Sequence, residues 1–87
     1  MAHYTPGGNF IDDHAETRMQ ERNVTDQQVD LAIQHGVMRP GNVPGRTEHH
    51  NTYNSRGRRM CLMVVTVTGT STVVTLYRHP ASRHQWP

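Results

Sequence analysis

The stretch HAETRMQERNVTDQQVDLAIQHG, residues 14–36, predicts two consecutive helices and decides the first half of the fold. Thr25 followed three residues later by Gln28 forms a capping box, in which each side chain binds a free backbone N–H of the first helical turn. Gly36 follows the apolar pattern and is typical of a helix end. The second helix is therefore predicted to begin after Thr25 and to end before Gly36.

The first helix is predicted to begin at Asp12 or Asp13, either of which can cap it, and to run to about Asn23. Apolar residues at four-residue spacing form the stripe that we expect to be buried: Ile11, Ala15 and Met19. The two helices together occupy residues 11–36.

After the helices, prolines and glycines mark residues 37–45 as a loop, with a short strand near Val37 left open. Apolar and β-branched residues then predict a sheet over residues 46–79. Its expected parts are an edge strand at 46–53, a turn at 54–57, a central strand at 58–68, a hairpin loop at 69–71 and a last strand at 72–79. Residues 1–10 are expected to form an irregular arm, and residues 80–87 a loose tail.

These elements predict an α+β fold with two N-terminal helices packed on one face of a three- or four-stranded antiparallel sheet. A chain of 87 residues supports one hydrophobic core, so residues 1–87 are expected to form a single domain. A chain of this size buries only roughly 60% of its unfolded surface. A monomer or a weak homodimer is compatible with so small a core.

Composition permits nucleic acid as a partner. All nine basic residues are arginine, whose planar guanidinium suits bidentate phosphate contacts, and the formal net charge is +2. The longest apolar run, Met60–Val65, is far too short to span a membrane, and the N-terminus has no apolar signal segment. We therefore expect a cytoplasmic protein with no membrane partner.

Cysteine and histidine usage gives no sign of a metal site or of another cofactor. Cys61 is the only cysteine, which excludes an internal disulfide, and its apolar strand predicts a buried, inert thiol. His49 and His50 are adjacent on a predicted strand, so their side chains point to opposite faces and cannot chelate one ion together.

A set of residues suited to RNA chemistry is split between the first helix and the last strand. His14 and Arg18 lie four residues apart on one helix face, and Arg22 continues the row. Alternation along the last strand places Thr75 and Tyr77 on a common face. If that face is turned toward the first helix, His14, Arg18, Thr75 and Tyr77 converge on one catalytic site.

Such a site would suit RNA cleavage by transesterification, in which the nucleophile is the 2′-hydroxyl of the substrate itself. His14 would transfer the proton, and Arg18 would neutralise charge on the phosphorane. Thr75 and Tyr77 would donate hydrogen bonds to phosphate oxygens, and Tyr77 would also stack on a base. The arginines expected to bind RNA are Arg22, Arg46, Arg58 and Arg59.

Each of these residues also has an ordinary structural interpretation. Arg18 has carboxylates within reach at Glu21 and Asp13, and Thr and Tyr are favoured in strands whatever their function. The arginines around residues 56–59 are typical of a solvated face. The alternative function is a non-catalytic binding module, a phage or mobile-element protein that engages a host protein or a nucleotide. Its contact surface would be the arginine-rich turn and the loop from Arg39 to Arg46.

Residues 11–79 resemble the family called domain of unknown function 4258. The residues that match its His-Ala-x-x-Arg-Met-x-x-Arg helix, the capped helix after it and the final Val-Thr-x-Tyr-like strand are His14, Ala15, Arg18, Met19, Arg22, Val24, Val29, Ile33, Gly36, Val74, Thr75 and Tyr77. The resemblance implies membership of a group of small nuclease-toxin folds that includes RelE-like, EndoU-like and barnase-like proteins.

The function implied by this resemblance is that of a metal-independent ribonuclease of the small toxin type. Its catalytic groups would be His14, Arg18, Thr75 and Tyr77, and its partner would be RNA, either tRNA or mRNA. The resemblance also implies a cognate antitoxin or immunity protein as a partner, and no residue of the chain decides whether one exists. The chain departs from the usual toxin profile in having no lysine, which argues against binding to ribosomes more than against cleavage of free RNA.

Overall fold

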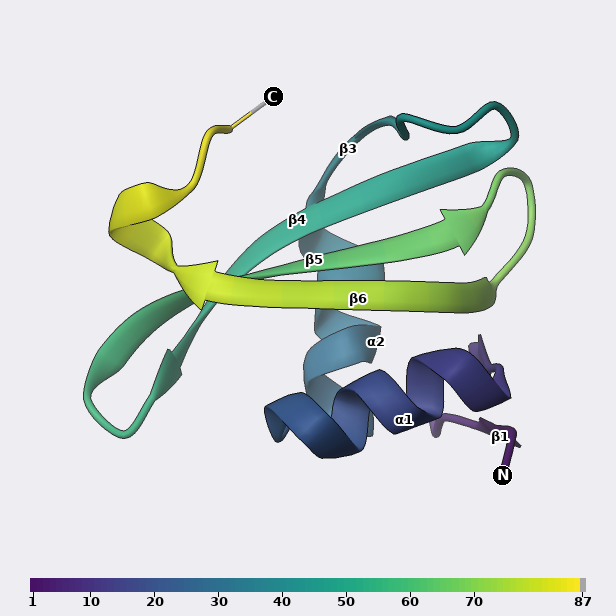
Figure 1. The fold of residues 1–87 in the computed structure, drawn as a ribbon, viewed down its shortest axis with the longest axis horizontal. Coiled ribbons are helices and arrows are strands. Elements are labelled where there is room, and N and C mark those ends of the chain that lie inside the picture. The colour runs from purple at the N-terminus through teal and green to yellow at the C-terminus, as the bar shows by residue number, and fades with distance from the viewer. Residues whose placement is uncertain (87) are drawn as a thin grey trace.

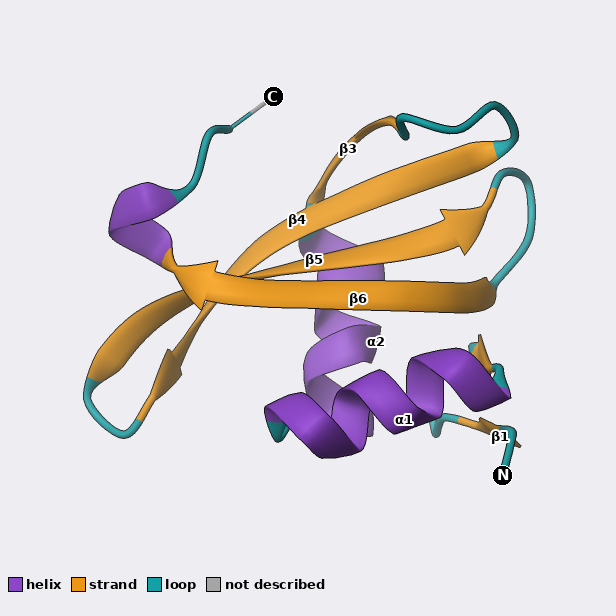
Figure 2. Ribbon diagram, in the orientation of Figure 1, coloured by secondary structure: helices purple, strands orange, loops and turns teal. Residues whose placement is uncertain are grey.

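The computed structural model describes residues 1–86 and joins two helices to one six-stranded sheet (Figures 1 and 2). Its elements in chain order are β1 (His3–Tyr4), β2 (Phe10–Ile11), α1 (Asp13–Arg22), α2 (Asp26–His35), β3 (Val37–Pro40), β4 (Arg46–Ser55), β5 (Arg58–Val67), β6 (Thr72–Pro80) and the short 3₁₀ helix η1 (Ala81–Arg83). The strands are arranged in the order β1-β2-β6-β5-β4-β3. Neither α-helix of the described residues is long and apolar enough to cross a membrane.

The expectation of a three- or four-stranded antiparallel sheet is wrong, although helices and strands are both present as predicted. The sheet is mixed, because β2 pairs with β6 in parallel while the other pairs are antiparallel. The arm expected to be irregular supplies β1 and Phe10 of β2, and Ile11, expected on the stripe of the first helix, is the second residue of β2. The predicted edge strand, β4, lies inside the sheet because β3 pairs with its outer edge. Strands of two residues have no periodicity, so no pattern in the arm could predict them.

Both predicted helices form, and their capping residues act as expected. Asp12 caps α1 by accepting a hydrogen bond from the backbone N–H of Ala15, and Asn23 ends the helix in the left-handed conformation. Thr25 and Gln28 make both hydrogen bonds of the predicted capping box at 3.2 and 3.0 Å.

One face of the sheet packs against the two helices. α2 lies behind β4 and β5 in Figure 1, and α1 runs alongside β6. Ala15 and Met19 of α1 meet Leu76 of β6 in the buried core, as the predicted apolar stripe requires. The buried residues of this core are Ile11, Ala15, Met19, Val24, Val29, Ala32, Leu62, Val64, Val73 and Leu76.

The N-terminal arm is held against α2 by one carboxylate. Asp30 accepts hydrogen bonds from the Thr5 hydroxyl, from the backbone N–H of Gly7 at 2.9 Å and from the Asn9 amide at 2.8 Å. These hydrogen bonds lower the pKa of Asp30 although its burial alone would raise it. The arm is thus fixed where β2 must join β6.

A histidine between two carboxylates ties the start of the arm to both helices. His3 lies 2.9 Å from an oxygen of Asp26 through Nε2 and 2.5 Å from an oxygen of Glu16 through Nδ1. The hydrogen bond to Asp26, followed by that to Glu16, raises the pKa of His3. Protonated His3 therefore stabilises the docked arm.

Replacing Thr25 with alanine removes one half of the capping box. The free energy of unfolding should fall by about 1 kcal/mol, because a backbone donor loses its partner. Urea denaturation would measure the change. Thr17→Ala is the control, because Thr17 lies on the exposed face of α1 and its loss should cost little. Equal destabilisation by the two variants would contradict the role of the cap.

The stability provided by His3 should depend on pH. Because its folded pKa lies above the unfolded value of about 6.5, the stabilisation is complete below that value and is lost as the pH rises through the folded pKa. His3→Gln should therefore destabilise the protein more near pH 6 than near pH 9 in thermal unfolding experiments. An equal loss at both pH values would show that the charge of His3 contributes nothing.

Candidate functional site

The face of the sheet turned away from the helical core carries the strongest concentration of reactive side chains. Residues directly opposite one another on neighbouring strands share a face. The register therefore aligns three rows on this outer face: Glu48 with Val65 and Thr75, His50 with Met63 and Tyr77, and Thr52 with Cys61 and His79. The predicted alternation of Thr75 and Tyr77 is confirmed, and His79 extends their line.

A groove of about 680 Å³ lies on this outer face. Met63 and Val65 of β5 are among its apolar lining residues, and the loop after β3 contributes Val43. Its polar lining includes Arg46, Glu48, Thr75, Tyr77 and His79. The volume is within the range of pockets that bind small ligands, and hydroxyl, imidazole, carboxylate and guanidinium groups are gathered around it.

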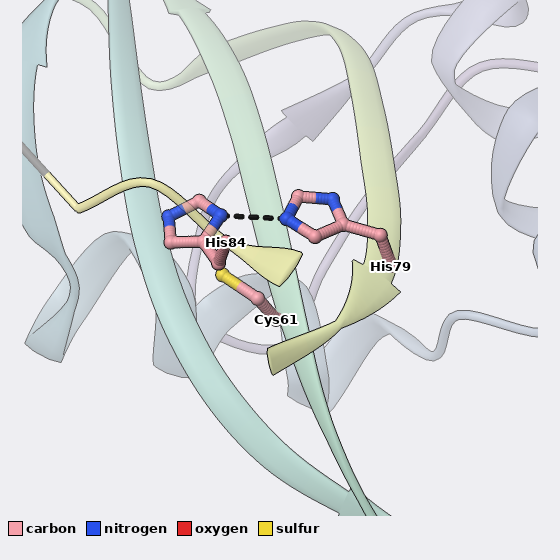
Figure 3. Close-up of side chains that lie close together, drawn as sticks. All are labelled: Cys61, His79 and His84. Atoms are coloured by element: carbon pink, nitrogen blue, oxygen red, sulfur yellow. Dashed lines mark hydrogen bonds between the residues drawn. The ribbon is translucent and has the colours of Figure 1, made fainter. Parts of the chain in front are cut away.

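Glu48 and His79, which both line the groove, are joined by a chain of hydrogen bonds. The Nε of Arg39 donates to Oε1 of Glu48 at 2.6 Å, and the same oxygen lies 3.0 Å from Nε2 of His50. Nδ1 of His50 lies 2.8 Å from Nε2 of His84. Nδ1 of His84 lies 2.6 Å from Nε2 of His79 (Figure 3). We call this chain from Glu48 through His50 and His84 to His79 the imidazole relay.

The carboxylate at the inner end of the relay is charged. Burial alone would raise the pKa of Glu48, but the hydrogen bonds from Arg39 and His50 outweigh burial and lower it. At the middle of the relay, burial and the nearby charges of His50, His79 and Arg39 lower the pKa of His84. The relay thus has an anionic end at Glu48 and a central imidazole that favours its neutral form.

A charged Glu48 fixes the direction of every hydrogen bond in the relay when the imidazoles are neutral. The carboxylate can only accept, so Nε2 of His50 donates and Nδ1 of His50 must accept. Nε2 of His84 then donates to His50, and Nε2 of His79 donates to His84. Nδ1 of His79 is consequently the unprotonated nitrogen, and it has no hydrogen-bond partner among residues 1–86. With neutral imidazoles the relay therefore ends in the unprotonated Nδ1 of His79.

Cys61 lies beside the outer end of the relay. It is fully buried as predicted, and burial raises the pKa of its thiol to about 11, so the thiol is protonated near neutral pH. Its sulfur and one nitrogen each from His79 and His84 lie within 4.8 Å of one another. These three residues are the group in the described chain that could hold a metal ion.

The predicted convergence of the first helix with Thr75 and Tyr77 does not occur, because the face that carries Thr75 and Tyr77 is turned away from the helices. His14 is exposed and its side chain makes no hydrogen bond within the described residues, and Arg18 pairs with Glu21 at 2.8 Å. Neither residue lines the groove that Thr75 and Tyr77 line. The ordinary interpretation of Arg18, pairing with Glu21, is the one that the structure shows.

Arg22 is the member of the helical row that reaches the last strand. Its guanidinium donates to the backbone carbonyl of Leu76 at 3.2 Å and lies 5.6 Å from the centre of the Tyr77 ring. A cation in this position favours a fixed orientation of the aromatic ring. Arg22 therefore positions Tyr77 from outside the groove.

The other arginines predicted to bind RNA fall at opposite ends of β4. Arg46 lines the groove. Arg58 and Arg59 follow the Arg56–Gly57 turn at the far end, where Arg58 is exposed and Arg59 donates to the Thr52 hydroxyl at 2.8 Å. The arginine-rich turn is therefore a surface separate from the groove.

Several residues of this site were missed by sequence reasoning. The tail after Pro80 was expected to be loose, yet η1 brings His84 against His50 and His79, and only Pro87 lies outside the described residues. Strand alternation alone places Glu48 and His50 on one face, so that pair could have been found. No pattern in the tail indicates that His84 joins them.

The direction of the relay predicts the tautomer of each imidazole. Nitrogen-15 NMR of the neutral protein should show His50, His84 and His79 all protonated at Nε2. Removing the anion in Glu48→Gln should produce a mixture of tautomers at His50, because an amide can donate as well as accept. Exposed His35 is the internal reference and should not change between the two proteins. Protonation of His79 at Nδ1 in the wild type would contradict the proposed direction.

Comparisons with known proteins identify no relative of this chain. No family model matches it, and no curated protein or solved structure matches it either. The resemblance of residues 11–79 to domain of unknown function 4258 thus stays a prediction from the sequence. Function has to be argued from the chemistry of the site.

Proposed function

We propose that this protein is a metal-independent ribonuclease of the small toxin type, acting on RNA in the cytoplasm, with its active site in the outer-face groove. The observation that carries the proposal is the imidazole relay, which ends at His79 in the groove that the hydroxyl side chains of Thr75 and Tyr77 also line. The proposed general base is therefore His79, in place of His14 on the helix.

In the proposed reaction, the ribose 2′-hydroxyl attacks phosphorus while the bond from phosphorus to the 5′ oxygen breaks. Nδ1 of His79 takes the proton of the 2′-hydroxyl. The hydroxyl of Tyr77 gives its proton to the leaving 5′ oxygen and recovers one from the imidazolium of His79. The products are a 2′,3′-cyclic phosphate and a free 5′-hydroxyl.

The remaining groups of the relay support the charge that develops on His79. An imidazolium at His79 is stabilised through His84 and His50 by the carboxylate of Glu48, much as the buried aspartate of a serine protease orients and stabilises its histidine. Arg39 holds Glu48 in place from its other side at 2.6 Å. Such support is provided by the residues of the relay and needs no metal ion.

Binding of the RNA phosphates along the groove is assigned to Arg46 and Thr75. Arg46 lines the groove, and the one hydrogen bond that its guanidinium makes within the described residues is to the carbonyl of Gly45 at 3.3 Å, so most of its side-chain donors are available. The Thr75 hydroxyl lies on the same face as Tyr77. A guanidinium and a hydroxyl at these places along the groove are suitable donors for phosphate oxygens of the bound RNA.

The experiment that tests this function is incubation of the purified protein with total RNA and with tRNA in EDTA. Wild type should leave 2′,3′-cyclic phosphate ends, and His79→Ala should lower the rate by about 100- to 10,000-fold, the usual contribution of an acid–base group. His35→Ala is the matched control and should cleave like the wild type, because His35 is exposed at the end of α2 and does not line the groove.

Two other results would change the assigned catalytic residue or the assigned function. Full activity in His79→Ala together with loss in His14→Ala would return catalysis to the helical row. Intact RNA with every variant would contradict a nuclease of free RNA and favour the binding module. In that case Arg58→Ala and Arg59→Ala, at the exposed turn, are the changes that should abolish binding.

A further inference from the structure

We infer that Cys61, His79 and His84 form a binding site for Zn²⁺ or a similar borderline-soft divalent metal. Cys61 and His79 are directly opposite each other on β5 and β6, and His84 reaches them from the segment after η1. Figure 3 shows the two imidazoles facing each other above the sulfur. One ligand atom from each residue lies within 4.8 Å of the other two.

The donor set and its spacing suit a zinc ion. One thiolate with two imidazoles is a combination that zinc accepts, and three protein ligands leave a fourth position for water or an anion. Zinc–nitrogen bonds of about 2.1 Å in a tetrahedral site separate two nitrogens by roughly 3.4 Å. Nε2 of His79 and Nδ1 of His84 are 2.6 Å apart, so the rings need to separate by less than about 1 Å.

The surroundings of His84 already resemble the outer shell of a metal site. A histidine that binds zinc through one nitrogen usually donates its other N–H to a carboxylate or a further acceptor. Here Nε2 of His84 donates to His50, and His50 donates to Glu48. Nδ1 of His84 is therefore left as a lone pair directed toward the proposed metal position.

Metal binding and the imidazole relay need the same nitrogens. Zinc would replace the hydrogen bond between His79 and His84 with two metal–nitrogen bonds, and the proton on Nε2 of His79 would leave or move to Nδ1. The thiol of Cys61 would release its proton to solvent as the zinc–sulfur bond forms. Zinc would thus break the relay at its outer end and inhibit cleavage, a consequence that rests on the proposed function.

The binding test uses the untagged full-length chain and Co²⁺ as a spectroscopic probe. One equivalent of Co²⁺ should produce the visible bands of a tetrahedral ion and a near-ultraviolet thiolate-to-metal band. Cys61→Ser should lose the thiolate band, and His84→Gln should lower the affinity at least about 10-fold. His35→Gln is the matched control and should bind like the wild type. Circular dichroism of each variant establishes that it is folded.

Two further measurements separate a metal site from chance binding. Glu48→Gln leaves all three ligands in place and should weaken Co²⁺ binding by about 10- to 100-fold, the usual effect of changing an outer-shell partner. Absence of tetrahedral bands in the wild type, or bands unchanged in folded Cys61→Ser and His84→Gln, would overturn the site.

The outcome for metal binding is distinguishable from the outcome for RNA cleavage. If the bands appear and Zn²⁺ stops a cleavage that proceeds in EDTA, both inferences stand. If the bands appear and Zn²⁺ leaves cleavage unchanged, the inhibitory role is wrong while the site stands. Binding without any cleavage in EDTA would support the site and contradict the proposed function.

Discussion

The antiparallel pairing of β4 with β5 is the constraint on which the rest of the structure depends. The two strands stay in register from Arg46 opposite Val67 to Ser55 opposite Arg58, with no bulge between them. A slip of one residue would exchange the two faces, moving Leu62 and Val64 out of the core and Cys61 into it. The same register places the His49 side chain on the core face of the sheet and the His50 side chain on the outer face.

The outer face is an uncommon place for so many polar groups to be buried. Glu48 and His50 are only 4% and 1% exposed, and a buried charge or imidazole without partners is costly. Each is instead bonded on both sides, Glu48 by Arg39 and His50, and His50 by Glu48 and His84. A fully bonded network of this kind fixes one arrangement, since displacing one member leaves its neighbours unpaired.

The sequence predicts local features well, but it does not predict contacts between residues that are far apart in the chain. The capping box at Thr25, the buried face of α1 and the alternation of Thr75 with Tyr77 follow from spacings of two to four residues, and all three are confirmed. The parallel pairing of β2 with β6 joins residues about sixty positions apart, and the contact of His84 with His50 joins residues thirty-four apart. No periodicity encodes such contacts, so the sheet order and the place of His84 in the site could not be predicted from the sequence.

Arg22 protects the partly uncovered edge of β6 from pairing with a strand of another molecule. β2 covers β6 only at Thr72 and Val73, which leaves the later backbone groups of that strand available as a template for a foreign strand. The guanidinium of Arg22 occupies the carbonyl of Leu76 and places a positive charge on this margin. An incoming chain would have to displace that charge before it could extend the sheet, so one side chain of α1 guards the protein against edge-to-edge aggregation.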